Sequence, residues 1–141
     1  GIAWLTSSGW ALQTNPGGVN VTCGGTFTQS SDRRLKDDIQ DVDLTECQRV
    51  FDAIMPRTYR RNDIETTKKR IGFVAQEVQD ALPDSFQNIV APCMHGEAKT
   101  EMLGIDYARS TCILWGVCKN QQKTLRELTE RLESLEAKST P

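Results

Sequence analysis

The sequence has little histidine, little proline and few aromatic residues, and it has no long apolar run. Its 141 residues include one histidine, five prolines, four phenylalanines, three tryptophans and two tyrosines. No segment approaches the roughly 18 apolar residues that a membrane span needs, and no basic segment followed by an apolar one opens the chain as a secretory signal would. We therefore expect a soluble chain without a membrane partner.

The cysteines and the single histidine lack the spacing of a metal or redox site. The five cysteines form an odd set without a CxxC pair, so they suit neither a disulfide framework nor a redox motif, and we expect reduced thiols. His95 lies two residues after Cys93, but no second ligand pair follows at the spacing of a zinc site. The sequence predicts no metal and no cofactor, and a loop position for His95. The cysteines are Cys23, Cys47, Cys93, Cys112 and Cys118.

The apolar share is low for a compact globule. Hydrophobic residues make up 38% of the chain and charged residues 26%. A shortage of core residues favours an elongated or oligomeric protein, because a small chain buries too little apolar surface by itself. The formal net charge of -2 argues against nucleic acid as the main partner, because neither sign of charge dominates.

Residues 1–30 have the composition of a fibrous segment. They hold six of the ten glycines and few charges, and they include an alternating stretch. That stretch is formed by Val19, Val21 and Cys23. Such a segment has little to bury alone, so we predict a β or irregular stalk that needs other copies of the chain to complete its packing.

The composition changes abruptly at Ser31, where the sequence SDRRLKDDIQDVD is dense in both charge signs. We therefore predict an α+β protein in three parts. Residues 1–30 are the end of a β-rich stalk, residues 31–106 a small mixed domain of helices and strands, and residues 107–141 a long helix that forms a coiled coil.

A helix and a hairpin are predicted after this boundary. Asp43 precedes a helical pattern with Glu46 three residues later, as in a capping box, and Pro56 ends the pattern. The sequence RTYRR, centred on Tyr59, predicts a short strand, and IGFV predicts its partner across the polar loop NDIETTKK.

Two further segments follow before the last helix. Residues 75–82 have an apolar face of Ala75, Val78 and Leu82, which predicts a helix that Pro83 ends. Residues 84–103 carry no clear periodicity, and we expect a loop that includes one strand.

The last segment predicts a helix of about 30 residues, from Tyr107 to Ala137, because it lacks proline and contains one glycine. Its second half has leucines at 3-4-3 spacing, and the same register extrapolates backward through Cys118, Leu114 and the polar Gln121 and Thr111. This spacing favours a parallel coiled coil between copies of the chain over an amphipathic helix packed within one chain. The leucines are Leu125, Leu128, Leu132 and Leu135.

Ser31 and Lys36 form the one candidate catalytic pair. A neutral lysine amine can take the proton of a serine hydroxyl. An ordinary lysine, with a pKa near 10.4, is neutral at pH 7 only at a cost of about 4.6 kcal/mol, so its site must favour the neutral form. Burial and the positive Arg33 and Arg34 would help, whereas Asp37 and Asp38 would oppose the neutral form if they came close, and the sequence leaves this balance open. Residues five apart on a helix point about 140° away from each other, so the pair requires a turn or extended backbone.

Three motifs in order resemble a known family. They are SDRRLKDDI from Ser31, IGFVAQEVQDALP from Ile71, and the leucine heptads. Together they resemble the intramolecular chaperone auto-processing domain at the C-termini of phage endosialidases, tail fibres, tailspikes and neck appendages, which also occurs in the myelin regulatory factor family. The resemblance covers about residues 31–137.

The resemblance implies a serine peptidase that cuts its own chain once. It places the nucleophile on Ser31, the base on Lys36 and the scissile bond between Ser30 and Ser31, with Asp32, Arg34 and Leu35 in supporting positions. It also implies a homotrimer whose C-terminal part folds the upstream fibre segment and is then released. Folding would take place in the host cytoplasm, and the mature part would join a virion tail or appendage.

Other interpretations stay open at this stage. The segment GFVAQEV is expected to pack around the site, and a direct role for Gln76 or Glu77 is conceivable. In the main alternative the chain is a non-catalytic trimerisation module or a receptor-binding fibre tip, in which Ser31 and Lys36 are surface groups. A DNA-binding protein is disfavoured because the basic residues are interleaved with acids.

Overall fold

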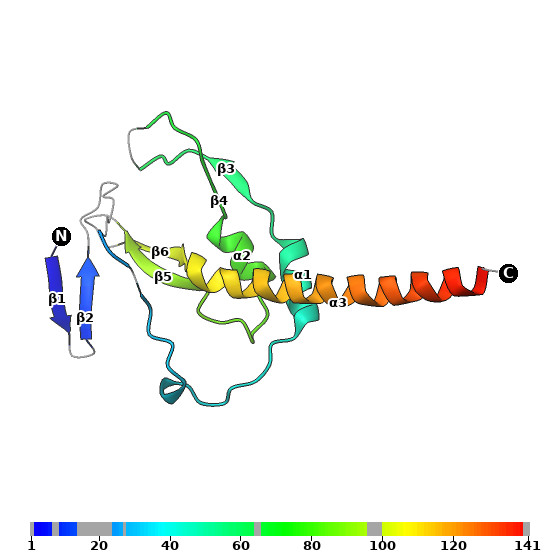
Figure 1. Ribbon diagram of the computed structural model, residues 1–141. Coiled ribbons are helices and arrows are strands. Elements are labelled where there is room, and N and C mark those ends of the chain that lie inside the picture. The colour runs from blue at the N-terminus through cyan, green and yellow to red at the C-terminus, as the bar shows by residue number, and fades with distance from the viewer. Residues whose placement is uncertain are drawn as a thin grey trace.

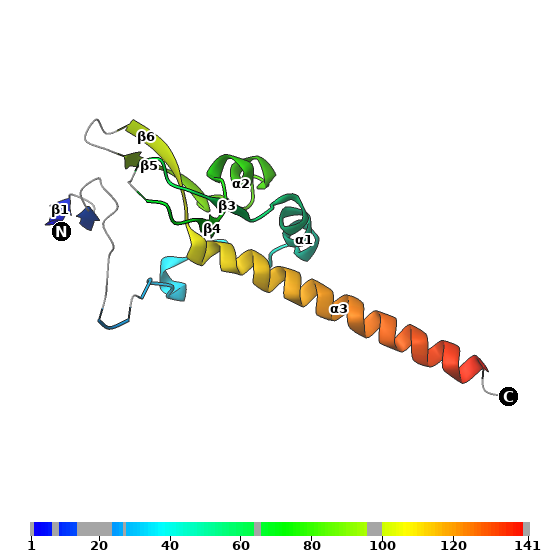
Figure 2. The same cartoon turned by 90° about the horizontal axis from the view of Figure 1, so that it is seen from above.

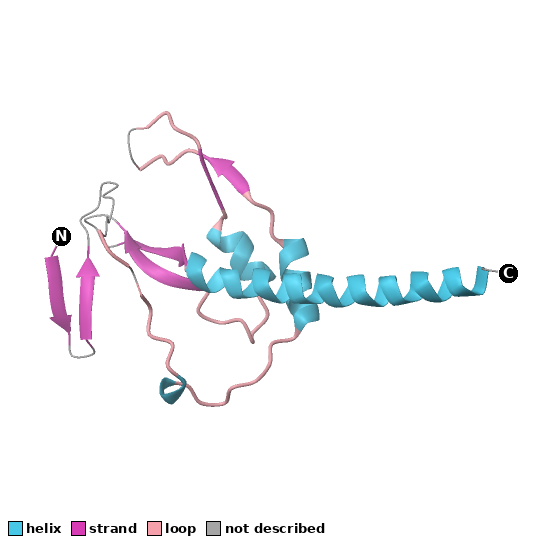
Figure 3. Ribbon diagram, in the orientation of Figure 1, coloured by secondary structure: helices cyan, strands magenta, loops and turns pink. Residues whose placement is uncertain are grey.

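The computed structural model describes residues 2–6, 9–13, 24–26, 28–63, 66–95 and 100–139. Figure 1 shows their order along the chain, and Figure 3 distinguishes helices from strands. The elements are β1 (Ile2–Thr6), β2 (Gly9–Gln13), the 3-10 turn η1 (Arg33–Leu35), α1 (Leu44–Ala53), β3 (Arg57–Tyr59), β4 (Arg70–Gly72), α2 (Ala75–Ala81), β5 (Val90–His95), β6 (Thr100–Ile105) and α3 (Tyr107–Ser139).

The described strands pair as three antiparallel hairpins, β1 with β2, β3 with β4, and β5 with β6. The predicted α+β class is therefore confirmed, and residues 1–30 do contain paired strands. The alternating stretch Val19 to Cys23 lies outside the described residues. None of the described helices combines the length and the apolarity that crossing a membrane requires.

Helix α1 and the β3–β4 hairpin form where the sequence predicts them. The Asp43 carboxylate accepts from the backbone N–H of Thr45 at 2.8 Å, which satisfies one of the free donors of the first turn. The helix ends at Ala53, shortly before Pro56. In the hairpin, Arg57 lies opposite Gly72.

The prediction for residues 84–103 is wrong, because this region contributes two strands. β5 and β6 pair over six residues each, from Val90 opposite Ile105 to His95 opposite Thr100. Only the ends of the hairpin near Val90 and Ile105 pack against the core, so most of both strands is exposed and shows little apolar alternation. His95 therefore ends a strand instead of lying in a loop.

The core lies where α1 crosses the first half of α3, with α2 and the base of the β5–β6 hairpin beside it (Figure 2). It is small, as the composition predicts. Beyond Asn120, every residue of α3 up to Ser139 is exposed, and the helix projects away from the rest of the chain. The buried residues are Cys47, Val50, Val78, Ile89, Ile113 and Val117.

Gly116 sets the distance between α1 and α3. A Cβ atom at this position would lie 2.9 Å from Cys47 Cβ and closer still to Cys47 Sγ, so the helices touch where a side chain is missing. Cys47 is 1% exposed and fills this contact. Burial raises the pKa of its thiol, with a further contribution from the nearby Asp43 carboxylate.

We predict that Gly116→Ala destabilises the domain. Alanine is the better helix former by about 1 kcal/mol, but overpacking a tight core contact costs about 1–3 kcal/mol, so we expect a net loss of about 1 kcal/mol in urea unfolding. Gly104→Ala is the control, because its nearest neighbour, Cys93 Sγ, lies at 3.4 Å. Equal or greater stability of Gly116→Ala would show that the helices have room to separate.

Candidate functional site

The segment after Ser30 folds into a single tight turn on the long loop that precedes α1, visible as a short coil in Figure 1. The backbone N–H of Leu35 donates to the carbonyl of Asp32, and that of Lys36 to the carbonyl of Arg33, both at 3.1 Å. The turn stops at Lys36, whose φ of -133° and ψ of 129° return the chain to extended backbone. This is the departure from helix that a pair five residues apart requires.

Asp32 holds this turn together. Its carboxylate accepts from the backbone N–H of Arg34 at 2.8 Å and caps the turn. The same carboxylate accepts from Arg34 Nε at 3.0 Å and from Nη2 at 2.9 Å, which makes a two-pronged ion pair. Arg34 is thus paired within its own turn.

These contacts keep Asp32 ionised. The side-chain hydrogen bonds from Arg34, its backbone N–H and the charge of Lys36 together lower the pKa of the Asp32 carboxyl below its ordinary value of 3.8. A lowered pKa means that the cap is fully present above the ordinary value and is lost as the pH falls through the lowered one. The turn therefore keeps its cap throughout the neutral range.

The turn brings Ser31 and Lys36 together. Lys36 Nζ donates to Ser31 Oγ at 2.6 Å, within the distance at which a proton can pass between the two atoms. Both residues are exposed, as is every described residue from 24 to 43. Leu35, in the same turn, is 71% exposed and packs against no core.

The pair lies at the edge of an open pocket of about 500 Å³. Ser30, Ser31 and Lys36 line it together with residues of the first turns of α3 and of the loop before β5. The scissile bond that the family resemblance implies therefore lies at a cavity and not on an isolated loop. The other lining residues are Gln29, Val42, Cys47, Phe86, Gln87, Ile89, Ala108, Arg109, Cys112 and Ile113.

Gln87 and Arg109 belong to this pocket, and no sequence motif points to them. Arg109 Nη1 donates to the carbonyl of Asn88 at 3.1 Å and lies 3.1 Å from the Asp106 carboxylate. Asn88 has a φ of 64°, in the left-handed region, so the hydrogen bond from Arg109 holds a residue of unusual conformation next to Gln87. Only the three-dimensional approach of segments far apart in sequence reveals these residues.

The GFVAQEV segment lies elsewhere. Glu77 accepts from Arg57 Nε and Nη2 at 3.1 Å each, which ties α2 to β3. Among the described residues, none of α2 lines the pocket beside Ser31. The segment thus packs on the core through Val78, and the geometry gives Gln76 and Glu77 no contact with the pair.

The described residues contain no group of three or more histidine, cysteine or acidic side chains placed to hold a metal ion. Four cysteines are free thiols, of which Cys47 is buried and the others are exposed. Cys112 lines the pocket beside Ser31, while Cys23 lies outside the described residues. The two groups that the turn brings together are the Ser31 hydroxyl and the Lys36 amine.

Comparison with known families decides the identity of this segment. Residues 31–86 match the Peptidase_S74 family, described as the chaperone of endosialidase. The segment is similar to the chaperone of endosialidase. The match begins at Ser31, where the composition changes, and it covers the turn, α1, the β3–β4 hairpin and α2. It spans less than half of the chain, and over that span the family resemblance that the sequence motifs indicated is confirmed. The description of the family supports a chaperone role, and its name suggests a peptidase.

We predict that loss of the Asp32 cap slows any reaction at the turn. Asp32→Ala removes both the cap and the ion pair, and we expect the rate of the self-cleavage that the family resemblance implies to fall roughly threefold to tenfold. Asp32→Asn keeps a capping oxygen and should lose less. Time courses on denaturing gels compare the three rates. An unchanged rate in Asp32→Ala would show that the turn forms without its cap.

Proposed function

We propose that this chain is an intramolecular chaperone that trimerises, assists folding of the fibrous segment before Ser31, and then releases itself by cutting the bond between Ser30 and Ser31. The observation that carries the proposal is the 2.6 Å contact of Lys36 Nζ with Ser31 Oγ, at the first residue of the matched segment. The reaction needs no cofactor.

In the proposed mechanism Ser31 Oγ attacks the carbonyl carbon of Ser30, while the neutral Lys36 amine accepts the hydroxyl proton. The Ser30–Ser31 C–N bond then breaks, Lys36 returns the proton to the leaving nitrogen, and an ester joins Ser30 to Ser31 Oγ. Water hydrolyses this ester to a carboxylate at Ser30 and a free hydroxyl at Ser31. The nucleophile and the carbonyl are neighbours in one chain, so little translational entropy is lost.

A partner surface must complete the site. A lysine acts as a base only in its neutral form, which removal of water favours, and in the single chain the pair is exposed. The positive charge of Arg34, which would favour a neutral amine, is already paired with the Asp32 carboxylate. The same loop carries exposed apolar side chains, Leu35, Ile39 and Val42, which would pack against other copies and exclude water from the pair. Cleavage would then follow assembly.

The exposed half of α3 supports self-association. Four leucines at heptad spacing are each more than half exposed, although leucine at this spacing usually forms the seam of a coiled coil. In the same register Arg131 takes a g position and Glu136 the following e position of a neighbouring copy, which is the pairing of parallel helices. The family name supports association with an upstream fibre protein. We place this assembly in a host cytoplasm and the mature fibre on a virion tail or appendage.

We predict that the purified chain separates on a denaturing gel into residues 1–30 and 31–141. Ser31→Ala removes the nucleophile and should abolish cleavage. Lys36→Arg keeps a positive charge but supplies no neutral amine, because arginine stays protonated, so it should also stay whole.

Ser30→Ala is the matched control, since the mechanism uses only the carbonyl of that residue, and it should cleave at a rate close to that of the unchanged chain. Persistent cleavage in both Ser31→Ala and Lys36→Arg would refute the assigned pair. A chain that stays whole in every form but still trimerises would support the alternative, a non-catalytic trimerisation module or receptor-binding tip.

We further predict that the leucine seam holds the copies together. Leu128→Asp and Leu132→Asp each place a charge at the seam and should shift sedimentation from trimer to monomer. Their exposure of 51% and 60% in the single chain means that the fold of one copy should survive, which circular dichroism would verify. Glu133→Asp, at an outer position of the same helix, should remain trimeric. An unchanged trimer in both leucine variants would exclude α3 as the interface.

A further inference from the structure

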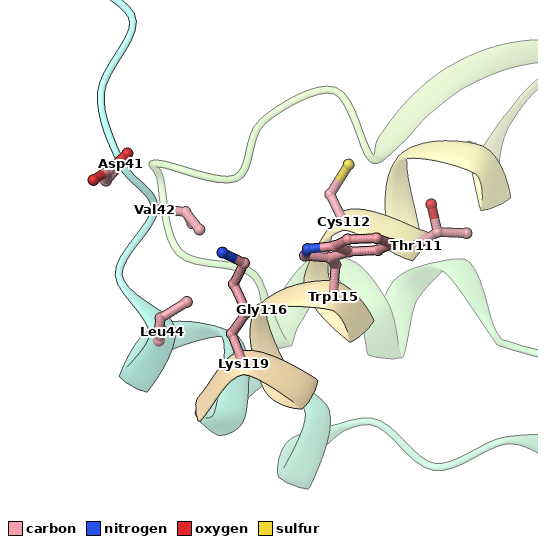
Figure 4. A pocket seen from close by; sticks show the side chains of 8 residues that line it. All are labelled: Asp41, Val42, Leu44, Thr111, Cys112, Trp115, Gly116 and Lys119. Carbon is pink, nitrogen blue, oxygen red and sulfur yellow. The ribbon is translucent and has the colours of Figure 1, made fainter. Parts of the chain in front are cut away.

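Trp115 is a large aromatic residue with little to cover it in its own chain. It is 71% exposed, although tryptophan side chains are highly buried on average. Figure 4 shows it on the face of α3 that also carries Cys112 and Lys119. An exposed tryptophan next to a self-associating seam is a candidate anchor for a second copy, because aromatic residues dominate binding energy at interfaces.

The leucine register fixes where Trp115 would point. Because α3 is continuous from Tyr107 to Ser139, the register continues backward from Leu125 without a break. It places Trp115 at an e position and Ser110 at the preceding g position. The extrapolated seam is exposed throughout, at Thr111, Leu114, Cys118 and Gln121. The buried residues of α3 are Ile113, Gly116 and Val117, which take c, f and g positions, so the buried face borders the seam on its g side.

A pocket lies on the g side of the seam. It is an apolar cavity of about 540 Å³ between the end of α1, the start of the Phe73 loop and α3. Ser110 and Leu114 form its wall on α3, and Phe51, Met55 and Phe73 are among the side chains opposite. Phe51 and Met55 are 45% and 61% exposed, so the pocket is open to a partner.

The geometry of a parallel coiled coil brings the exposed Trp115 of one copy close to the apolar pocket of another. In such an assembly a g residue of one helix faces the e residue five positions later on its neighbour. Ser110 therefore faces Trp115 of a second copy. The same rule pairs Arg131 with Glu136 of that copy, so charge complementarity and the apolar match follow from one register.

We propose that Trp115 of each copy inserts into the apolar pocket beside Ser110 of its neighbour. This inference rests on the parallel assembly in the proposed function and names its second anchor. The Ser110 hydroxyl donates to the Asp106 carbonyl at 3.0 Å, so its oxygen lone pairs are available to the indole N–H, which needs an acceptor when buried.

The surface area that these insertions would bury is a sizeable part of a protein–protein interface. A buried aromatic side chain removes roughly 150–250 Å² from water, and a trimer makes three such insertions. Against the roughly 1,200–2,000 Å² of a standard interface, these anchors are a substantial addition to the leucine seam. They also explain how the helices associate where Thr111 and Gln121 interrupt the apolar pattern.

Photo-crosslinking of the full chain tests the insertion. A benzophenone amino acid replaces Trp115, and isotopically light and heavy chains are mixed during folding. We expect light-to-heavy cross-links from position 115 to the peptide containing Phe51 and Met55. The same probe at Gln122, the next e position, should instead reach the region of Val117.

A trimer without cross-links from position 115 to the pocket would overturn the insertion and leave the proposed assembly intact. A chain that sediments as a monomer at every concentration would overturn both. These outcomes are distinct from failure of cleavage, which the gel assay reports separately.

A second measurement uses affinity. Trp115→Ala should raise the concentration at which the trimer dissociates by roughly tenfold or more, as loss of an interface anchor does, and Trp115→Phe should raise it less. Ile71→Ala removes a side chain that is 76% exposed and does not line the pocket, so it should leave dissociation unchanged. Equal dissociation of Trp115→Ala and Ile71→Ala would contradict the proposal.

Discussion

The close approach of α1 to α3 at Cys47 and Gly116 is the contact on which the rest of the fold depends. It buries one face of the first half of α3, and most of the small core gathers around it. Helix α1 covers only this one face of α3. The adjacent face of α3, with its leucine seam and Trp115, stays exposed. Among the described residues the core holds six buried side chains, which is too few to cover a helix of this length and supports the proposal that further copies pack against it.

The turn from Asp32 to Lys36 is built differently from this core. It is held by local hydrogen bonds and one ion pair, all at the surface, and no residue of the turn is buried. Local contacts are sufficient to bring an amine to a hydroxyl, but they do not remove water from the pair. The single chain therefore places the Lys36 amine next to the Ser31 hydroxyl, whereas assembly would remove water from the pair. In the proposed function, such a division would prevent a chain from cutting itself before it has partners.

Sequence patterns predicted the elements whose signals are local. Short-range signals mark the helices, and the structure contains them. The signals are Asp43 and the apolar face that follows it for α1, Pro56 and Pro83 after the ends of α1 and α2, and the leucine heptads for α3. The β5–β6 hairpin was missed because its strands are mostly exposed and contain Pro92 and Gly104, which weaken any alternating pattern. For the site, the sequence could indicate that Ser31 and Lys36 require a turn. It could not indicate that Arg109 and Gln87 line the same pocket, because segments far apart in sequence meet there only in the folded chain. The predicted division into three parts, with boundaries after residues 30 and 106, stays a prediction.

In the proposed function, the order of events follows from where the contacts lie. A seam on α3 and an anchor at Trp115 would both act C-terminal to the proposed scissile bond, so they would align three chains while residues 1–30 are still attached to them. Once the stalk segments had packed together, the alignment would no longer be needed, and cutting before Ser31 would remove the helices that provided it. The released fibre would then lack the element that brought its strands into register, so a strand that separated would have no ready path back. Its persistence would rest on a high barrier to unfolding and not on an equilibrium with separated chains. A chaperone that cut itself away in this manner would make the folding of the fibre effectively irreversible.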